Sequence, residues 1–210
     1  MAKIFISGSS TGLGLMTGRL LVEQGHQVVL HGRSAARSAD ARDQLPEAFE
    51  VVTGDLSTVR GARTVAEQVN RLGRFDAVIH NAGIGYREPK RVETEDGMPE
   101  VFATNVLAPF VLTALIQRPV RLVYLSSGMH QSAVVQLDDL AWERRRWSGS
   151  TAYAESKLYD VLLAFAAARL WPDVFANALE PGWVPTRMGG PGGLDDMDQA
   201  HRTQAWLCRQ

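Results

Sequence analysis

Tyr153 and Lys157 lie four residues apart in the stretch STAYAESK, which opens an apolar run that continues to Leu170. Residues at this spacing share one face of an α-helix, so a phenol and an ammonium should stand side by side at the edge of a core. A tyrosine in water has a pKa of about 10, too high for acid–base work near neutrality. A neighbouring ammonium favours the phenolate and lowers that pKa. The pair alone is common on ordinary helices, so its chemistry depends on what meets it.

The elements that must position this pair alternate along the chain between short apolar runs and longer helical patterns. Strands are expected at 3–7, 26–32, 49–56, 75–83, 121–128 and 173–182, and a long helical region at 96–118 is interrupted at Pro99 and Pro109. Strands that are apolar throughout and separated by helices indicate a parallel sheet covered on both faces. Right-handed crossovers make it an α/β, Rossmann-type doubly wound sheet, in which ligands bind beyond the carboxyl ends of the strands.

Length and charge bound the class of protein. A chain of 210 residues is predicted to be one domain, 1–210, whose last part, 184–210, is a substrate loop and C-terminal region. The formal net charge of −1 argues against nucleic acid or anionic lipid as a partner. A single cysteine, Cys208, suits a reducing compartment, and neither a membrane span nor a signal peptide is evident. A cytoplasmic protein with no metal site is expected.

A glycine-rich turn follows the first strand, with the pattern GxxxGxG from Gly8 to Gly14. Such a turn lacks side chains, so backbone N–H groups and a helix N-terminus can approach a pyrophosphate. Its position between a strand and a helix favours a dinucleotide over a purely steric role for the glycines. The residues expected to bind this cofactor are Gly8, Ser10, Thr11, Gly12, Leu13 and Gly14.

The second strand ends in His31-Gly32-Arg33-Ser34, without the acidic residue that binds the ribose hydroxyls of NAD. Arg33 is able instead to pair with a 2′-phosphate, helped by the Ser34 hydroxyl. The alternative is a surface arginine at the start of a helix, where the helix dipole disfavours it. The end of this strand therefore favours NADP(H) as the cofactor, with NAD(H) as the alternative.

The ends of two further strands carry residues that are suited to bind a nucleotide. Asp55, with Leu56, closes the third strand, where its carboxylate is placed to accept the adenine amino group. Its alternative role is an N-terminal helix cap. Asn81, Ala82 and Gly83 close the fourth, and their small size permits close approach. The fifth strand ends near Ser127, whose hydroxyl is suited to hold a substrate carbonyl and stabilise its developing alkoxide.

Together these motifs resemble the short-chain dehydrogenase/reductase family over about residues 3–186. GSSTGLG resembles the family's TGxxxGxG turn, with Ser7 in place of Thr, and HNAG resembles NNAG, with His80 in place of the first Asn. Asn105, in TNVLAP, matches the asparagine of the catalytic tetrad. Ser127, Tyr153 and Lys157 match its other members. The segment PGWVPT resembles the PGxVxT that lies along the nicotinamide, which implies contacts from Pro181, Gly182, Val184 and Thr186.

The resemblance implies a mechanism. Tyr153 would donate a proton to a carbonyl oxygen while NADPH delivers hydride. Lys157 would lower the tyrosine pKa and bind the nicotinamide ribose, Ser127 would orient the substrate, and Asn105 would support a proton-relay water. The stretch 130–150 is similar to the loop in retinol-dehydrogenase-like carbonyl reductases, which implies a small carbonyl or alcohol substrate. The alternative is a non-catalytic NADP(H)-binding sensor on the same fold.

Three further expectations concern surfaces. The apolar faces of 101–115 and 158–170, which form dimers in the family, predict a homodimer. The cluster WERRRW is expected to be a solvated loop. No seventh strand follows the sixth, so the sixth should form an open edge. We also expect 189–193 to be mobile and the terminal helix to pack loosely or against a partner.

Overall fold

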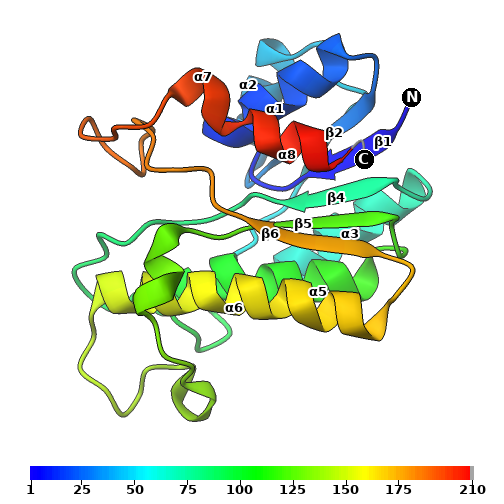
Figure 1. Ribbon diagram of the computed structural model, residues 1–210. Coiled ribbons are helices and arrows are strands. Elements are labelled where there is room, and N and C mark those ends of the chain that lie inside the picture. Colours follow the sequence, from blue (N-terminus) through cyan, green and yellow to red (C-terminus); the bar gives the residue numbers. More distant parts are fainter. Residues whose placement is uncertain (209–210) are drawn as a thin grey trace.

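Six parallel strands form one sheet in the order β3-β2-β1-β4-β5-β6 (Figure 1). The structure is a computed structural model and describes residues 1–208. The order reverses between β1 and β4, the switch point at which doubly wound sheets bind ligands. This confirms the predicted fold class. The strands are β1 Lys3–Ile6, β2 Gln27–Gly32, β3 Glu50–Thr53, β4 Ala77–His80, β5 Arg121–Leu125 and β6 Phe175–Leu179.

Helices cover both faces of the sheet. Figure 1 shows α1, α2 and α8 on one face and α3, α5 and α6 on the other. Because side chains alternate along a strand, Ile4 and Ile6 of β1 enter the core beneath the first group, while Phe5 enters the core beneath the second. The main helices are α1 Gly12–Glu23, α2 Ala35–Gln44, α3 Val59–Arg71, α5 Ala108–Leu115, α6 Gly149–Leu170, α7 Met197–Ala200 and α8 Arg202–Leu207.

The helical region before β5 is interrupted, as its prolines predict. Pro99 precedes the short α4, Glu100–Phe102, and a π-helical segment, Ala103–Leu107, leads into α5. Pro109 has no N–H to donate to the carbonyl of Asn105 four residues earlier, which breaks the regular α-helical pattern. The Ala108 N–H instead bonds to the Ala103 carbonyl, five residues back. Asn105 therefore lies in a π turn, a feature often found at functional sites.

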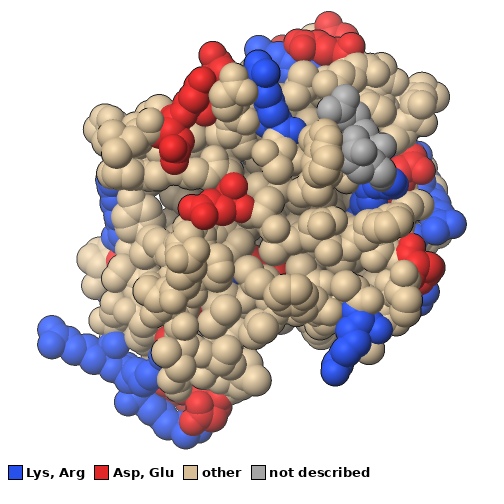
Figure 2. Space-filling model, viewed as in Figure 1, with Lys and Arg blue, Asp and Glu red and all other residues tan. Residues whose placement is uncertain are grey.

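The loop before α6 is anchored by a partly buried charge cluster. Arg145 forms ion pairs with Asp139 at 3.0 Å and with Glu155 at 2.6 Å, and its guanidinium lies over the Trp142 ring. The expectation that WERRRW is wholly solvated is therefore wrong for its central arginine. The flanking arginines, 144 and 146, are exposed, and Figure 2 shows basic side chains gathered over this loop.

The C-terminal region packs on the chain itself. Helix α8 lies against α1, β5 and β6, and it buries Gln204, Ala205 and Cys208. The expectation that the terminal helix packs loosely is therefore wrong, because the sheet and α1 cover the face of this helix that carries Gln204 and Ala205. Within residues 1–208 no strand follows β6, which forms an edge of the sheet as predicted. No helix in this described part is long and apolar enough to cross a bilayer.

Candidate active site

The glycine turn after β1 is packed directly against the end of β4. Gly8 has a φ of +62°, and a β-carbon there would lie 2.6 Å from the Ala82 Cα. A β-carbon at Gly14 would lie 2.4 Å from the Asn81 Nδ2. Both distances are too short for any side chain, so glycine is required at the two positions where the turn meets β4.

Ser7 and Asn81 fix this contact with uncharged hydrogen bonds. The Ser7 hydroxyl oxygen accepts bonds from the backbone N–H groups of Asn81 and Ala82, both at 3.0 Å. The Asn81 amide donates to the carbonyls of Ser7 at 3.0 Å and Gly8 at 2.9 Å. The predicted cofactor residue Asn81 therefore uses its side chain to hold the turn in place.

His31, at the end of β2, braces the same turn from the other side. Its Nδ1 accepts a bond from the Gly8 N–H at 2.9 Å, and its Nε2 lies 2.8 Å from the Gly54 carbonyl, which assigns the proton to Nε2. Burial lowers the pKa of His31 to about 4, against the opposing pull of its bond to Gly54. His31 was not predicted to be part of the site. Its position near the end of an apolar strand was a signal that it lies close to the glycine turn.

The start of α1 is suited to an anion. Within the described residues the side chain of Thr11, the N-cap, makes no capping bond, and nothing lies within 4 Å of a β-carbon built at Gly12. The N–H groups of the first helical turn therefore remain open to a ligand at the positive end of the helix dipole. A dinucleotide pyrophosphate fits the residues present here.

The predicted adenosine-end residues lie at the carboxyl ends of β2 and β3. Arg33 is exposed, and the Ser34 hydroxyl caps α2 by accepting a bond from Arg37 N. The Asp55 carboxylate accepts a bond from the Ser57 N–H at 2.9 Å. Thr58, not Asp55, caps α3, so the alternative role for Asp55 as that cap is wrong. The Leu56 side chain lies in the hydrophobic core.

A cavity of about 480 Å³ opens at the ends of β5 and β6. Seven of the predicted residues line it: Leu13, Ser127, Tyr153, Pro181, Gly182, Val184 and Thr186. The wall also includes residues that no sequence motif had indicated, among them Tyr86, Met129, Glu180, Trp183 and Met188. The sheet thus brings the start of α1, the end of β5 and the segment after β6 to one cavity.

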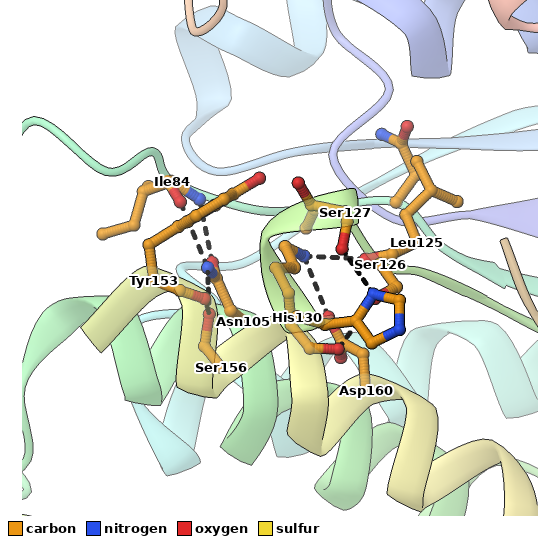
Figure 3. Close-up of polar contacts among 12 residues, drawn as sticks. Ile84, Asn105, Leu125, Ser126, Ser127, His130, Tyr153, Ser156 and Asp160 are labelled. Carbon is orange, nitrogen blue, oxygen red and sulfur yellow. Dashed lines mark hydrogen bonds and ion pairs between the residues drawn. The ribbon is translucent and has the colours of Figure 1, made fainter. Parts of the chain in front are cut away.

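Tyr153 enters this cavity from the first turns of α6 (Figure 3). Its ring lies 5.7 Å from the Tyr86 ring, and its hydroxyl lies 3.8 Å from the Met188 sulfur. The Lys157 Nζ lies 5.7 Å from the centroid of the Tyr153 ring, on the face predicted from the spacing. Ser127 lines the same cavity and caps the short helix that follows it, Gly128–Ser132.

Asn105 is fully buried beneath the site. Its side-chain oxygen accepts a bond from the Ile84 N–H at 2.9 Å, and its amide donates to the Ile84 carbonyl at 3.1 Å and the Ser156 hydroxyl at 3.0 Å (Figure 3). The side chain therefore ties the loop after β4 to α6. Asn105 lies beside the cavity rather than on its wall.

Lys157 is held by a buried carboxylate. Its ammonium donates to the Leu125 carbonyl at 2.7 Å and to the Asp160 carboxylate at 2.8 Å, and both charged side chains are almost fully buried. Burial opposes the charge on Lys157, but attraction to Asp160 and Tyr153 outweighs it and raises the pKa of the ammonium. A β-carbon built at Gly83 would lie 3.7 Å from Nζ, so the ammonium faces the end of β4. Sequence reasoning gave Asp160 no role.

A model of the short chain dehydrogenase family matches residues 2–195. The chain is 45% identical over 201 residues to an uncharacterized oxidoreductase of Emericella nidulans, covering 93% of this chain and 76% of that protein. It is 31% identical over 205 residues to retinol dehydrogenase 13 of Homo sapiens, covering 91% of this chain and 61% of that protein.

Solved structures show the same architecture. A crystal structure of a protein from Mycobacterium paratuberculosis matches all of this chain and 77% of its own with a TM-score of 0.87 and 29% identity. A blue fluorescent protein from a metagenomic library, crystallised in complex with NADPH, matches 91% of this chain and 78% of its own with a TM-score of 0.74 and 25% identity.

Proposed function

This chain belongs to the short-chain dehydrogenase family of oxidoreductases, and on that basis we propose that it interconverts a carbonyl and an alcohol with NADP(H). One observation carries the proposal. The Tyr153 phenol projects into a cavity shared with Ser127, while the Lys157 ammonium lies 5.7 Å from its ring. This is the arrangement that a protonating phenol requires, because the nearby positive charge favours the phenolate.

The residues of this site have distinct roles in the proposed reduction. The Tyr153 hydroxyl donates its proton to the carbonyl oxygen and is left as a phenolate, which the Lys157 charge stabilises. The Ser127 hydroxyl donates a hydrogen bond to the same oxygen as negative charge develops there. Asn105 acts from below by holding the loop at Ile84 against α6. Tyr86 and Trp183 line the cavity beside the reacting atoms.

The cofactor would be held by the glycine turn, the start of α1 and the ends of β4 and β6. When bound, NADPH supplies the hydride that the carbonyl carbon receives. We assign Arg33 to the 2′-phosphate because it is exposed at the end of β2, where the sequence offers no carboxylate. The NADPH complex of the metagenomic blue fluorescent protein supports a cofactor of this kind on this fold.

We assign the substrate to the class of apolar carbonyls and alcohols. The cavity wall carries Tyr86, Met129, Trp183 and Met188, which present ring and thioether surfaces beside the Tyr153 hydroxyl. Apolar walls with a few convergent polar groups are typical of small-molecule sites. The relative retinol dehydrogenase 13 is named for an apolar alcohol, which supports this class.

We also propose that two copies of the chain form a homodimer through α5 and α6. Phe110 of α5 is 55% exposed and Phe165 of α6 is 70% exposed, so both helices keep apolar side chains that the sheet does not cover. Two symmetry-related copies would bury them in one isologous interface. Light scattering should then give twice the chain mass at high micromolar concentration, and Phe165→Glu should give the monomer. A monomeric wild-type protein would reject the dimer.

The function itself is tested by following NADPH consumption with a panel of aldehydes, ketones and quinones. Steady oxidation of NADPH with one class, and formation of the matching alcohol, is the expected result. Tight NADPH binding without consumption across the panel would instead favour a non-catalytic sensor on the same fold.

A further inference from the structure

The ammonium of Lys157 does not act alone in this site, because Asp160 lies 2.8 Å from it on the same helix. The exposed fractions of the two side chains are 6% for Lys157 and 3% for Asp160. Asp160 lies beyond the cavity wall, so it touches neither the site of the carbonyl nor the Tyr153 hydroxyl (Figure 3). Its direct contact with the catalytic machinery is the lysine.

We propose that Asp160 is a positioning and charge-tuning residue, which fixes the Lys157 ammonium between Leu125 and Gly83 and sets the positive charge felt by Tyr153. The inference rests on the proposed acid–base role of Tyr153. It adds a fifth polar group to the four predicted from the sequence, and it acts through Lys157 rather than on the substrate.

The positioning part follows from hydrogen-bond geometry. An ammonium has three donors, and the Leu125 carbonyl and the Asp160 carboxylate take two of them on one side. The third is directed by these two toward the end of β4, where Nζ faces Gly83. A flexible lysine thus gains one fixed direction, toward the place at which the ribose of the nucleotide would lie.

The charge part follows from burial. Two opposite charges 2.8 Å apart, screened from water, attract strongly and present a much smaller net charge to a third group nearby. The phenolate of Tyr153 is therefore stabilised less than it would be by a lone ammonium. Burial raises the pKa of Asp160 to about 6 even with Lys157 beside it, so the carboxylate is ionised near neutrality.

Other titratable groups lie on the elements packed against this part of α6. Tyr124 of β5 is buried, which raises its pKa to about 12, so it stays neutral. His130 follows β5, with its Nδ1 2.6 Å from the Ser127 carbonyl, and Glu100 starts α4. β5 also carries Arg121 at its start. β6 contributes no titratable side chain, but Glu180 directly follows it and lines the cavity with Tyr153. A substitution at Asp160 leaves all of these in place, so they form a common background.

The test is the ultraviolet titration of Tyr153, taken as the difference between each protein and the same protein carrying Tyr153→Phe. Asp160→Asn keeps the shape and an acceptor oxygen but removes the charge. We expect the midpoint of Tyr153 to move by about one pH unit in this variant, because the charge beside the phenol changes. It falls where Lys157 keeps its proton, whose charge is then no longer offset, and it rises where the buried lysine loses that proton. The matched control is Asp139→Asn, which removes another buried, ion-paired carboxylate outside this cavity and should leave the midpoint unchanged.

Asp160→Ser serves the same test if the asparagine variant does not fold. An unchanged midpoint in a folded Asp160 variant would overturn the proposal. So would an equal shift in Asp139→Asn, because the effect would then be general to buried carboxylates. The titration needs no substrate, so it decides the role of Asp160 even if no carbonyl is reduced and the proposed function fails.

Discussion

The two ends of the ligand site are held together by different physics. At the nucleotide end, the turn from Ser7 to Gly14 is fixed by neutral groups, with Asn81 and His31 bonded to its backbone. At the catalytic end, α6 holds a buried ion pair, Lys157–Asp160. Neutral hydrogen bonds fix geometry at little electrostatic cost, whereas buried charges are costly to keep and change the chemistry of their neighbours. In the proposed function, the first end binds the nucleotide and the second transfers a proton.

This difference predicts that the largest fall in the free energy of unfolding follows the loss of a charge at the catalytic end. Lys157→Met leaves the Asp160 carboxylate buried without its partner, so we expect the free energy of unfolding to fall by about 3–5 kcal/mol. The double variant Lys157→Met with Asp160→Leu should regain most of this stability and still lack turnover. Urea unfolding and NADPH-dependent turnover measure both. A single variant as stable as the wild type would show that the pair does not matter to folding.

At the nucleotide end, the affinity for NADPH should depend more on close packing than on charge. Gly8→Ala forces a β-carbon against the Ala82 backbone at a φ of +62°, so we expect NADPH affinity to fall about 10- to 100-fold. Gly25→Ala is the matched control, because Gly25 has a φ of +81° and nothing among the described residues within 4 Å of its β-carbon. Fluorescence titration with NADPH compares them. Equal losses in both variants would contradict the packing argument.

Buried neutral histidines make the stability of the fold depend on pH. Burial lowers the pKa of His80 to about 3, so the unfolded chain takes up this proton near pH 6.5 while the folded chain does not. Stability from His80 is therefore present above pH 6.5 and falls as the pH drops toward 3. His80→Phe should reduce the stability lost between about pH 7 and about pH 5 by about 2 kcal/mol, measured by urea unfolding. Identical losses in both proteins would assign the acid sensitivity to other groups.

The smallest expected effect concerns the choice of cofactor. Arg33→Asp replaces a donor to the 2′-phosphate with a carboxylate that repels it and suits ribose hydroxyls. We expect the ratio of NADPH to NADH affinity to fall by at least about tenfold, or about 1.4 kcal/mol. Dissociation constants for both cofactors in both proteins test this. Equal affinities in the wild type would remove Arg33 from the site.

Patterns among residues close in the sequence were enough to predict which elements form the site. Glycine spacing, strand ends and the four-residue step from Tyr153 to Lys157 each need only neighbouring residues, and the parallel sheet brings them together at one edge. The strand bounds were less accurate. The fourth strand was expected at 75–83, but β4 is Ala77–His80, because the chain leaves the sheet at Asn81 to meet the glycine turn.

These local patterns could not predict contacts between segments that are distant in the sequence. The bond from Gly8 to His31 joins residues 23 apart, and the packing of Gln204 near Thr17 joins residues 187 apart. Asp160 is different, since its three-residue step from Lys157 was visible. The apolar run around it concealed that the carboxylate would be buried with the ammonium. A charged residue one helical turn from a catalytic lysine is a signal that sequence reading can use.

The central claim is that Tyr153 is the proton donor, and Tyr153→Phe tests it most directly. The variant lacks a single hydroxyl, so NADPH should bind within about threefold of the wild type while turnover of a verified carbonyl falls about 10²–10⁴-fold. Both quantities are measured on the same preparation, by fluorescence titration and by NADPH consumption. Turnover near the wild-type rate in a variant that binds NADPH normally would contradict the account.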